Sequence, residues 1–161
     1  SEQTVQGFSS GRCDVLTSDR SQLAALRSKL PDPNSAVILP NIISKEPLGP
    51  VVRQGDDEWF NIVKWVLFVQ INAEELGVTS ANVDDMKKSD NPSVKRLLGT
   101  DGDMGAKLGL AADFGYHIIK QVGNYGEMYN RNVGPGTPLD LERGLNALWS
   151  DGGIMYAPPV R

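Results

Sequence analysis

The carboxylate of Asp19 is the side chain best placed to do chemistry in this sequence. It follows an apolar run, residues 13–17 (CDVLT), that predicts a buried strand, and it precedes a helical pattern that begins at Ser21. In α/β proteins, groups at the carboxyl ends of strands contact ligands, and a carboxylate can hold an ammonium group by charge-assisted hydrogen bonds. Asp19 could instead cap the helix that follows, and spacing alone favours this structural role.

The other residues that could take part in catalysis or metal binding are predicted to have structural roles. Asp101 and Asp103 could begin a calcium loop, but Gly105 and Lys107 stand where further ligands would be needed, so we predict an ordinary turn. His117, the sole histidine, lies in an apolar helical stretch without a recognisable Ser or Cys partner, which indicates a packed or surface residue. We therefore predict no catalytic residue and no metal site.

Cofactor and stacking sites are not indicated either. No glycine-rich phosphate-binding motif follows a predicted strand, so no cofactor is expected. The tryptophans, Trp59, Trp65 and Trp149, lie in expected helices, where packing in the core is the default over stacking on a ligand.

Composition describes an ordinary folded chain. With 161 residues, 40% hydrophobic and 22% charged, the chain can form one domain or parts of two small lobes. A net charge of -4 with scattered basic residues argues against nucleic acid as a partner.

Cys13 is the single cysteine and cannot form an internal disulfide. Because residue 1 is Ser rather than Met, we expect a processed or cut chain, so the lack of a signal peptide does not argue for the cytoplasm.

Periodicity predicts an α/β class, with helices and strands alternating in the first part of the chain. Helices are expected at 2–10 and 21–30, and strands at 13–17 and 36–39. Residues 42–53 are predicted to be extended, with prolines that limit ladder hydrogen bonds.

The rest of the chain is predicted to be helical and turn-rich. Acidic residues at 56–58 precede an apolar helical face that ends at Gly77. The further expected helices lie at 83–88, 93–98, 106–129 with a break near Gly123, and 139–149.

Long strings of this sequence resemble polar amino acid-binding proteins of the periplasm. Residues 11–20 (GRCDVLTSDR) resemble the second-lobe strand of that family, and residues 46–55 (EPLGPVVRQG) resemble the return crossing into the first lobe. The helix from Asp57 and the stretch 125–130 (YGEMYN) are similar to the closing helices of the same fold. The sequence is most similar to the general L-amino acid branch, whose members carry a long helical insertion and a comparable tail.

The resemblance implies a periplasmic binding protein type II-like α/β fold, present in part. Residues 1–43 would be the carboxyl-terminal part of lobe 2. Residues 44–161 would hold the crossover, near 43–49, and the carboxyl-terminal part of lobe 1, with a helical insertion at 78–123 and a tail at 137–161. The family's amino-terminal half, which supplies the arginine for the ligand carboxylate, has no counterpart here.

The function implied is capture of L-amino acids in the periplasm and delivery to the permease subunits of an ABC importer. In this interpretation Asp19 binds the ligand ammonium, and Thr17 and Ser18 are weaker candidates for the pocket wall. The chain would then carry only half of the site, without enzymatic activity or cofactor. The missing half predicts association, either with that half or with a second copy of the chain.

Two alternatives stay open. An enzyme on the same fold, such as a dehydratase of cyclohexadienyl acids, needs a positioned general acid, and only Asp19 stands at a suitable place. A non-binding remnant or interaction module would keep the scaffold without the ligand.

Overall fold

A computed structural model describes residues 2–45 and 47–161, which form two compact units. Unit 1 comprises Ser1–Leu48 and Asn132–Glu142, and unit 2 comprises Gly49–Arg131 and Arg143–Arg161. None of the described helices combines the length and the apolar character that crossing a bilayer requires. The assignment of the chain to two lobes with a crossover near residues 43–49 stays a prediction, and Glu46, within that crossover, lies outside the described residues.

Unit 1 contains two of the predicted helices. They are α1 (Glu2–Ser9) and α2 (Arg20–Arg27), followed by the 3-10 turn η1 (Pro33–Ser35). Gly11 ends the first helix in the left-handed conformation, with φ of 71°, a value that glycine adopts without steric cost. The amides of Arg12 and Cys13 then fold back onto the carbonyl of Gly7, at 2.9 and 3.2 Å.

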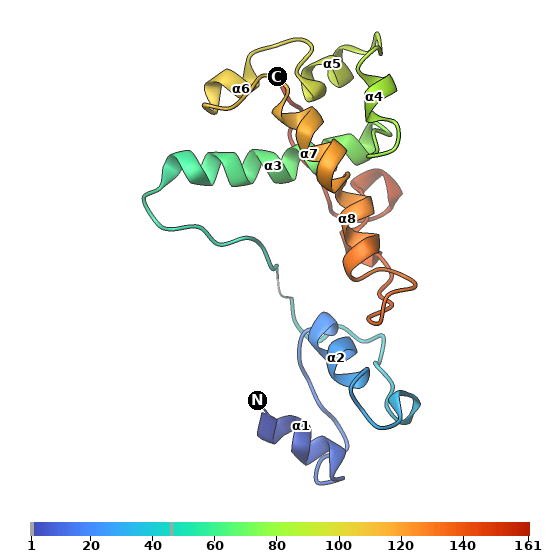
Figure 1. Cartoon of the computed structure of the whole chain (residues 1–161). Helices are drawn as coiled ribbons and strands as arrows, with labels where there is room; N and C mark the ends of the chain where they lie inside the picture. The colour runs from blue at the N-terminus through green and yellow to red at the C-terminus, as the bar shows by residue number, and fades with distance from the viewer. Residues whose placement is uncertain (1, 46) are drawn as a thin grey trace. The chain divides into compact units, whose positions relative to one another are not determined.

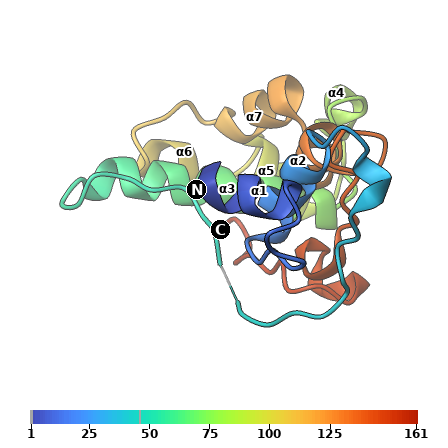
Figure 2. The ribbon, with the colours of Figure 1, turned by 90° about the horizontal axis from the view of Figure 1, so that it is seen from below.

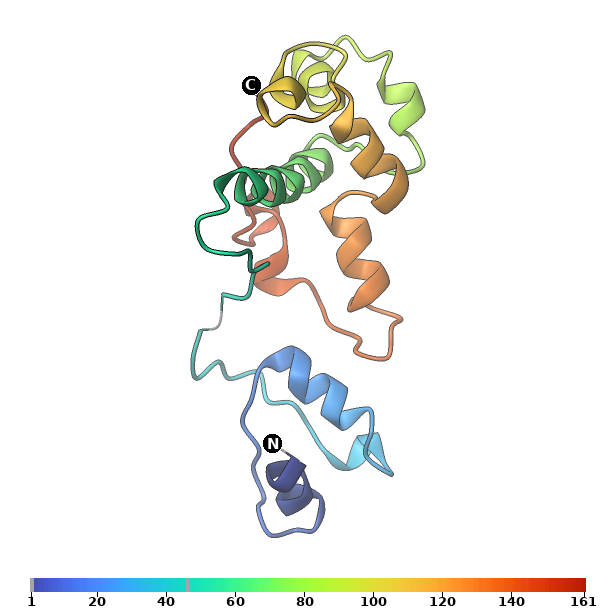
Figure 3. The same cartoon turned by 60° about the vertical axis from the view of Figure 1, so that its left-hand side comes forward.

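The two predicted strands of unit 1 are not formed as paired strands, which corrects the prediction for residues 13–17 and 36–39. Within the described part of the chain, the backbone of residues 14–18 and 36–45 takes part in no backbone–backbone hydrogen bond. Figure 3 shows the first segment running as an extended trace from α1 to α2, and Figure 2 shows the chain after η1 as coil. A strand needs a neighbour for its ladder, and the described residues supply none.

Unit 2 holds the remaining helices. They are α3 (Asp57–Glu75), α4 (Val83–Met86), α5 (Pro92–Leu98), α6 (Met104–Lys107), α7 (Phe114–Val122), α8 (Tyr125–Asn132), and the 3-10 turns η2 (Gly144–Asn146) and η3 (Trp149–Asp151). The predicted long helix at 106–129 is therefore broken twice, once before α7 and again at Gly123, where φ is 87°.

The core of unit 2 lies where α5 and α7 cross the carboxyl-terminal half of α3 (Figure 1). Val69, Leu97 and Ile119 contribute one fully buried side chain from each of these helices. Gly115 allows the close approach of α7 to α5, because a Cβ built on it would lie 2.0 Å from the carbonyl oxygen of Leu97. Burial of this cluster holds unit 2 together.

The amino-terminal half of α3 has much less cover. Asp56 caps the helix by accepting a hydrogen bond from the backbone amide of Trp59 at 3.1 Å. Trp65 packs against the core, as predicted, whereas the side chains of Trp59 and Trp149 are 52% and 51% exposed. The prediction of core packing is thus wrong for these two residues, and Trp149 instead makes an edge-to-face contact with Tyr156, with the ring centroids 5.8 Å apart.

The predicted helix at 139–149 is also wrong. Asp140 and Gly144 both adopt left-handed backbone conformations with φ of 49°, which interrupt α-helical hydrogen bonding. The chain instead turns through η2 and η3 and makes one parallel bridge between Leu148 and Met155. The spacing of apolar residues wrongly predicted a helix here, because the left-handed residues turn the backbone out of the helical path.

The tail after this bridge packs against the helical core. The side chain of Val160 is buried in the core cluster, and its carbonyl accepts a hydrogen bond from Arg96 Nε at 3.2 Å. Asn72 on α3 donates to the carbonyl of Pro158 at 2.9 Å. The tail is therefore a structural part of unit 2.

A half-buried carboxylate anchors the start of α8 to the loop after α3. Glu127 and Asn124 form a reciprocal pair typical of a capping box, with hydrogen bonds of 2.8 and 2.9 Å. Glu127 also accepts hydrogen bonds from the backbone amide and the hydroxyl of Ser80. Burial would raise the pKa of Glu127, but these hydrogen bonds outweigh it and hold the pKa below its usual value.

Replacing Gly115 with Ala tests the helix crossing. In an open helix this change adds about 0.5–1 kcal/mol of stability, but here the new methyl group meets the Leu97 carbonyl oxygen. We expect the free energy of unfolding to fall by about 1–3 kcal/mol in urea titrations followed by circular dichroism. Gly49→Ala, where no atom lies within 4 Å of the position that the new methyl group would take, is the control and should be nearly neutral. A stabilised Gly115→Ala protein would contradict the close crossing.

Replacing Glu127 with Gln tests the anchor of α8. Because the pKa of Glu127 is lowered in the folded state, the ionised carboxylate stabilises the fold above its unfolded-state pKa, and this contribution disappears as the pH falls through the folded-state pKa. We expect the variant to be about 1–3 kcal/mol less stable at neutral pH. The difference from the unchanged protein should shrink as the pH falls below the unfolded-state pKa and through the lowered pKa of the folded state. Glu75→Gln, near the carboxyl end of α3, is the control for the loss of one acidic side chain, and we expect it to change the stability at neutral pH by less than about 0.5 kcal/mol.

Candidate functional site

Asp19 stands at the amino terminus of α2, where both of its predicted roles would place it. Its backbone carbonyl accepts the first helical hydrogen bond, from the amide of Leu23 at 2.8 Å. Its side chain, however, makes no capping hydrogen bond, unlike the carboxylates of Asp32 and Asp56, which accept from amides of the turns that they begin. Asp19 occupies the cap position without performing the capping function.

The carboxylate of Asp19 is partly enclosed. Its Oδ1 atom is buried and accepts no hydrogen bond within the described part of the chain. Covering a carboxylate oxygen without a donor is costly, and the positive end of the α2 dipole offsets part of this cost. The arrangement favours a cationic hydrogen-bond donor as the partner of this oxygen.

Thr17 and Ser18, the weaker candidates, are both exposed in the segment that leads to Asp19. The hydroxyl of Ser18 donates to Oε1 of Gln22 in the first turn of α2. Ser18 is thus engaged with its own helix, whereas Thr17 has an exposed side chain in the extended segment. All three candidates therefore lie together at one end of this segment, and their role in binding stays a prediction.

The acidic pair at 101–103 forms a turn. Asp101 accepts a hydrogen bond from the amide of Gly102 at 2.9 Å, and Asp103 pairs with Lys107 at 2.8 Å. Across residues 2–45 and 47–161, no three His, Cys, Asp or Glu side chains are grouped as metal ligands would be. The lone histidine, His117, lies on the surface of α7 with Nε2 at 3.2 Å from the carboxylate of Asp113.

A surface cluster that joins α4 to α7 was missed by sequence reasoning. Asp84 accepts hydrogen bonds from the hydroxyl of Tyr116 at 2.8 Å and from the ammonium of Lys120 at 2.6 Å. The hydrogen bond from Lys120 lowers the pKa of Asp84, and the Asp84 carboxylate raises the pKa of Tyr116 and of Lys120. Lys87 lies 4.0 Å over the Tyr116 ring. The cluster links two helices through groups that already pair with one another.

A second unpredicted pair joins α3 to the segment before η2. Arg143 and Glu74 make two hydrogen bonds, at 2.9 and 3.1 Å, and each side chain is only 19% exposed. The guanidinium also lies 5.3 Å from the Tyr125 ring and 5.2 Å from the Tyr129 ring. Burial raises the pKa of Tyr125. Because both charges are paired and fixed by packing, this is a structural ion pair.

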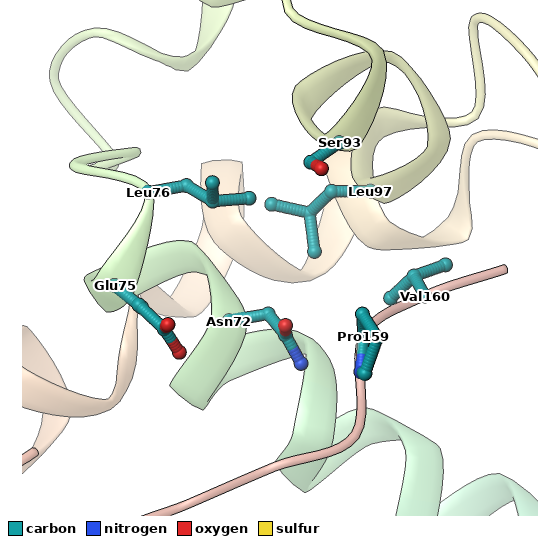
Figure 4. A pocket seen from close by; sticks show the side chains of 7 residues that line it. All are labelled: Asn72, Glu75, Leu76, Ser93, Leu97, Pro159 and Val160. Carbon is teal, nitrogen blue, oxygen red and sulfur yellow. The ribbon is translucent and has the colours of Figure 1, made fainter. Parts of the chain in front are cut away.

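Unit 2 contains a small cavity between α3, α5 and the tail (Figure 4). Its volume is about 130 Å³, and its lining residues are Asn72, Glu75, Leu76, Ser93, Leu97, Pro159 and Val160. Ligand sites for small molecules usually measure about 300–1,000 Å³. The Asn72 amide is already committed to the carbonyls of Phe68 and Pro158. We interpret the cavity as imperfect packing beneath the tail.

The chain is similar to amino-acid-binding proteins of bacterial transport systems. It is 60% identical over 156 residues to the general L-amino acid-binding periplasmic protein AapJ of Rhizobium johnstonii, a match that covers 96% of this chain and 46% of the relative. It is 56% identical to the putative amino-acid ABC transporter-binding protein YhdW of Escherichia coli, covering 100% of this chain and 48% of the relative. No family model matches the sequence.

A solved structure has the same fold. A periplasmic binding protein of an ABC transporter from Brucella ovis, with glutathione bound, matches with a TM-score of 0.93 and 52% identity, covering 99% of this chain and 50% of that protein. The predicted fold class is thereby confirmed, although the predicted strands are unpaired here. The chain spans about half the length of the relatives that it matches. Over nearly its whole length, this chain is thus a homologue of one half of the periplasmic binding proteins of amino-acid ABC transporters.

Proposed function

We propose that this chain supplies one side of the ligand site of a periplasmic protein that captures L-amino acids and delivers them to the permease subunits of an ABC importer. The observation that carries the proposal is Asp19, a carboxylate at the end of an extended apolar segment, without a capping bond and with one covered oxygen that accepts no described hydrogen bond. The names of the relatives support the same ligand class.

Asp19 binds the ammonium group of the ligand in this proposal. Its charge and the enclosure of Oδ1 favour a charge-assisted hydrogen bond over solvation by water. Thr17 contributes to the pocket wall from its exposed position, and Ser18 supports α2 through Gln22. The carboxylate of the ligand requires cationic or amide donors, which the unmatched half of the protein supplies.

The ligand range includes any molecule with an amino acid end group. Glutathione, which is bound in the Brucella ovis protein, carries an ammonium beside a carboxylate just as a free amino acid does. Both ligands would present the same cation to Asp19. A ligand panel should therefore contain glutathione beside the L-amino acids.

The test is a continuous chimera in which this chain is joined to the unmatched part of the Rhizobium johnstonii relative. We expect calorimetry to show saturable binding of at least one L-amino acid or of glutathione. Asp19→Asn should weaken binding at least about 30-fold, since removing one partner of an enclosed charge pair costs about 2–5 kcal/mol. Asp32→Asn, in the same unit, is the matched control and should leave affinity unchanged, because Asn can still accept the hydrogen bond from Asn34. Equal affinity in both variants would remove Asp19 from the site.

The proposal also assigns no catalysis to the chain, in contrast to a dehydratase on the same fold. The described side chains form no acid–base set with Asp19, and His117 belongs to unit 2, where it faces Asp113. We expect the chimera to bind its ligand without converting it and to leave cyclohexadienyl acids unchanged, as measured by absorbance and mass spectrometry. Turnover that Asp19→Asn abolishes would favour the enzyme.

A further inference from the structure

The turn between α5 and α6 contains an Asp–Gly pair, Asp101 and Gly102, that the proposed function does not use. The backbone amide of Gly102 donates a hydrogen bond to the carboxylate of Asp101, the residue just before it, at 2.9 Å. A second Asp–Gly pair, Asp151 and Gly152, lies at the end of η3. The chain therefore offers a reactive site and an internal comparison with the same two residue types.

An Asp–Gly pair can rearrange without an enzyme. The backbone nitrogen of the glycine loses its proton and attacks the side-chain carboxyl carbon of the aspartate. A C–N bond forms and water leaves, which closes a succinimide ring. Water then hydrolyses one of the two C–N bonds of the ring. Cleavage at the side-chain carbonyl restores Asp, whereas cleavage at the main-chain carbonyl gives isoaspartate of the same mass, in which the main chain runs through the β-carbon.

The first pair has the geometry and the backbone freedom that ring closure needs. The hydrogen bond holds the nitrogen of Gly102 beside the carboxyl group that it would attack. In the part of the chain that the structure describes, this amide donates to no backbone carbonyl. A Cβ built on Gly102 would meet its nearest atom, Cγ of the flexible Arg96 side chain, only at 3.7 Å. Both Asp101 and Gly102 are exposed, so water can reach the ring.

The second pair is held more firmly. The amides of Asp151 and Gly153 both donate to the carbonyl of Leu148, at 2.9 Å. A Cβ built on Gly153 would lie 1.9 Å from the carbonyl oxygen of Ala147, so the backbone packs closely just after this pair. Among the described residues, no hydrogen bond joins the amide of Gly152 to the carboxylate of Asp151. Ring closure at Asp151 would require the turn to open first.

We propose that Asp101 is a site of spontaneous isomerisation to isoaspartate in the folded protein, whereas Asp151 is protected. The inference does not depend on the proposed function, since Asp101 belongs to unit 2 and Asp19 to unit 1. Isomerisation creates a new α-carboxylate at an exposed turn. Isoaspartate methyltransferases esterify this group with the methyl group of S-adenosylmethionine. The isomerised turn is thereby a substrate for repair enzymes of this class.

The test is peptide mapping of the chain by mass spectrometry after prolonged incubation at neutral pH. Isoaspartate is identified by its retention time and its diagnostic backbone fragments. We expect at least about 10-fold more isoaspartate at Asp101 than at Asp151, because only the first pair has its nitrogen held beside the carboxyl group. In concentrated urea, where neither turn is folded, the two rates should become similar. Equal rates in the folded protein, or a faster reaction at Asp151, would overturn the proposal.

Variants assign the product to its residue. Asp101→Glu keeps the carboxylate but adds a methylene, so the same attack would have to close a larger ring that forms more slowly. We expect no isoaspartate-type product at this position and an unchanged amount at Asp151. Asp151→Glu is the matched control and should leave the reaction at Asp101 unchanged. Both side chains are exposed, so the helical circular dichroism of each variant should equal that of the original protein.

Methyl transfer gives an independent readout. An isoaspartate methyltransferase with labelled S-adenosylmethionine should label the incubated chain and the incubated Asp151→Glu variant, but not the freshly purified chain. Incubated Asp101→Glu should lose most of the label. A variant that keeps the full label would place the modification elsewhere and overturn the assignment to Asp101.

Discussion

The backbone groups of an extended segment must be paired before its side chains can leave water, and this constraint governs the first unit of the protein. Residues 13–17 and 36–39 have the apolar content of buried strands, but the backbone groups of residues 14–17 and 36–39 find no backbone partner among the described residues. Burial would leave these groups unsatisfied, at a cost of about 1–3 kcal/mol each. Val15, Val37 and Leu39 therefore stay exposed despite their hydrophobicity.

The second unit meets the same requirement for backbone pairing through its helices. Its helices satisfy their own backbone groups, so apolar side chains on α3, α5 and α7 can bury one another without outside help. Among these helices, the first turns of α3 lack cover, as the half-exposed rings of Trp59 and Phe60 show. We infer that unit 2 is the more self-sufficient of the two units, because residues 14–17 and 36–39 of unit 1 have no described backbone partner.

Local signals in the sequence were enough to predict most of the helices, because a cap, a stop and a periodic face lie within one segment. The α3 helix has all three, from Asp56 to Gly77. The wrong or absent predictions concern features that are set by backbone conformation or by contacts between residues far apart in the chain. Apolar residues recur at helical spacing in residues 139–149, but left-handed backbone geometry at Asp140 and Gly144 prevents the helix. The pair of Glu74 with Arg143 joins residues far apart in the chain, and no spacing rule could have found it.

Residue type and position were enough to select Asp19, but only the structure could show that its side chain makes no cap and that one oxygen is covered. The same geometry limits what one carboxylate can do. Two opposite unit charges about 4 Å apart attract by about 1 kcal/mol in water and about 4 kcal/mol near a protein surface. The larger value corresponds to a dissociation constant of about 1 mM. If Asp19 binds a zwitterion as proposed, useful affinity also requires a cationic group for the ligand carboxylate on a second wall of the site.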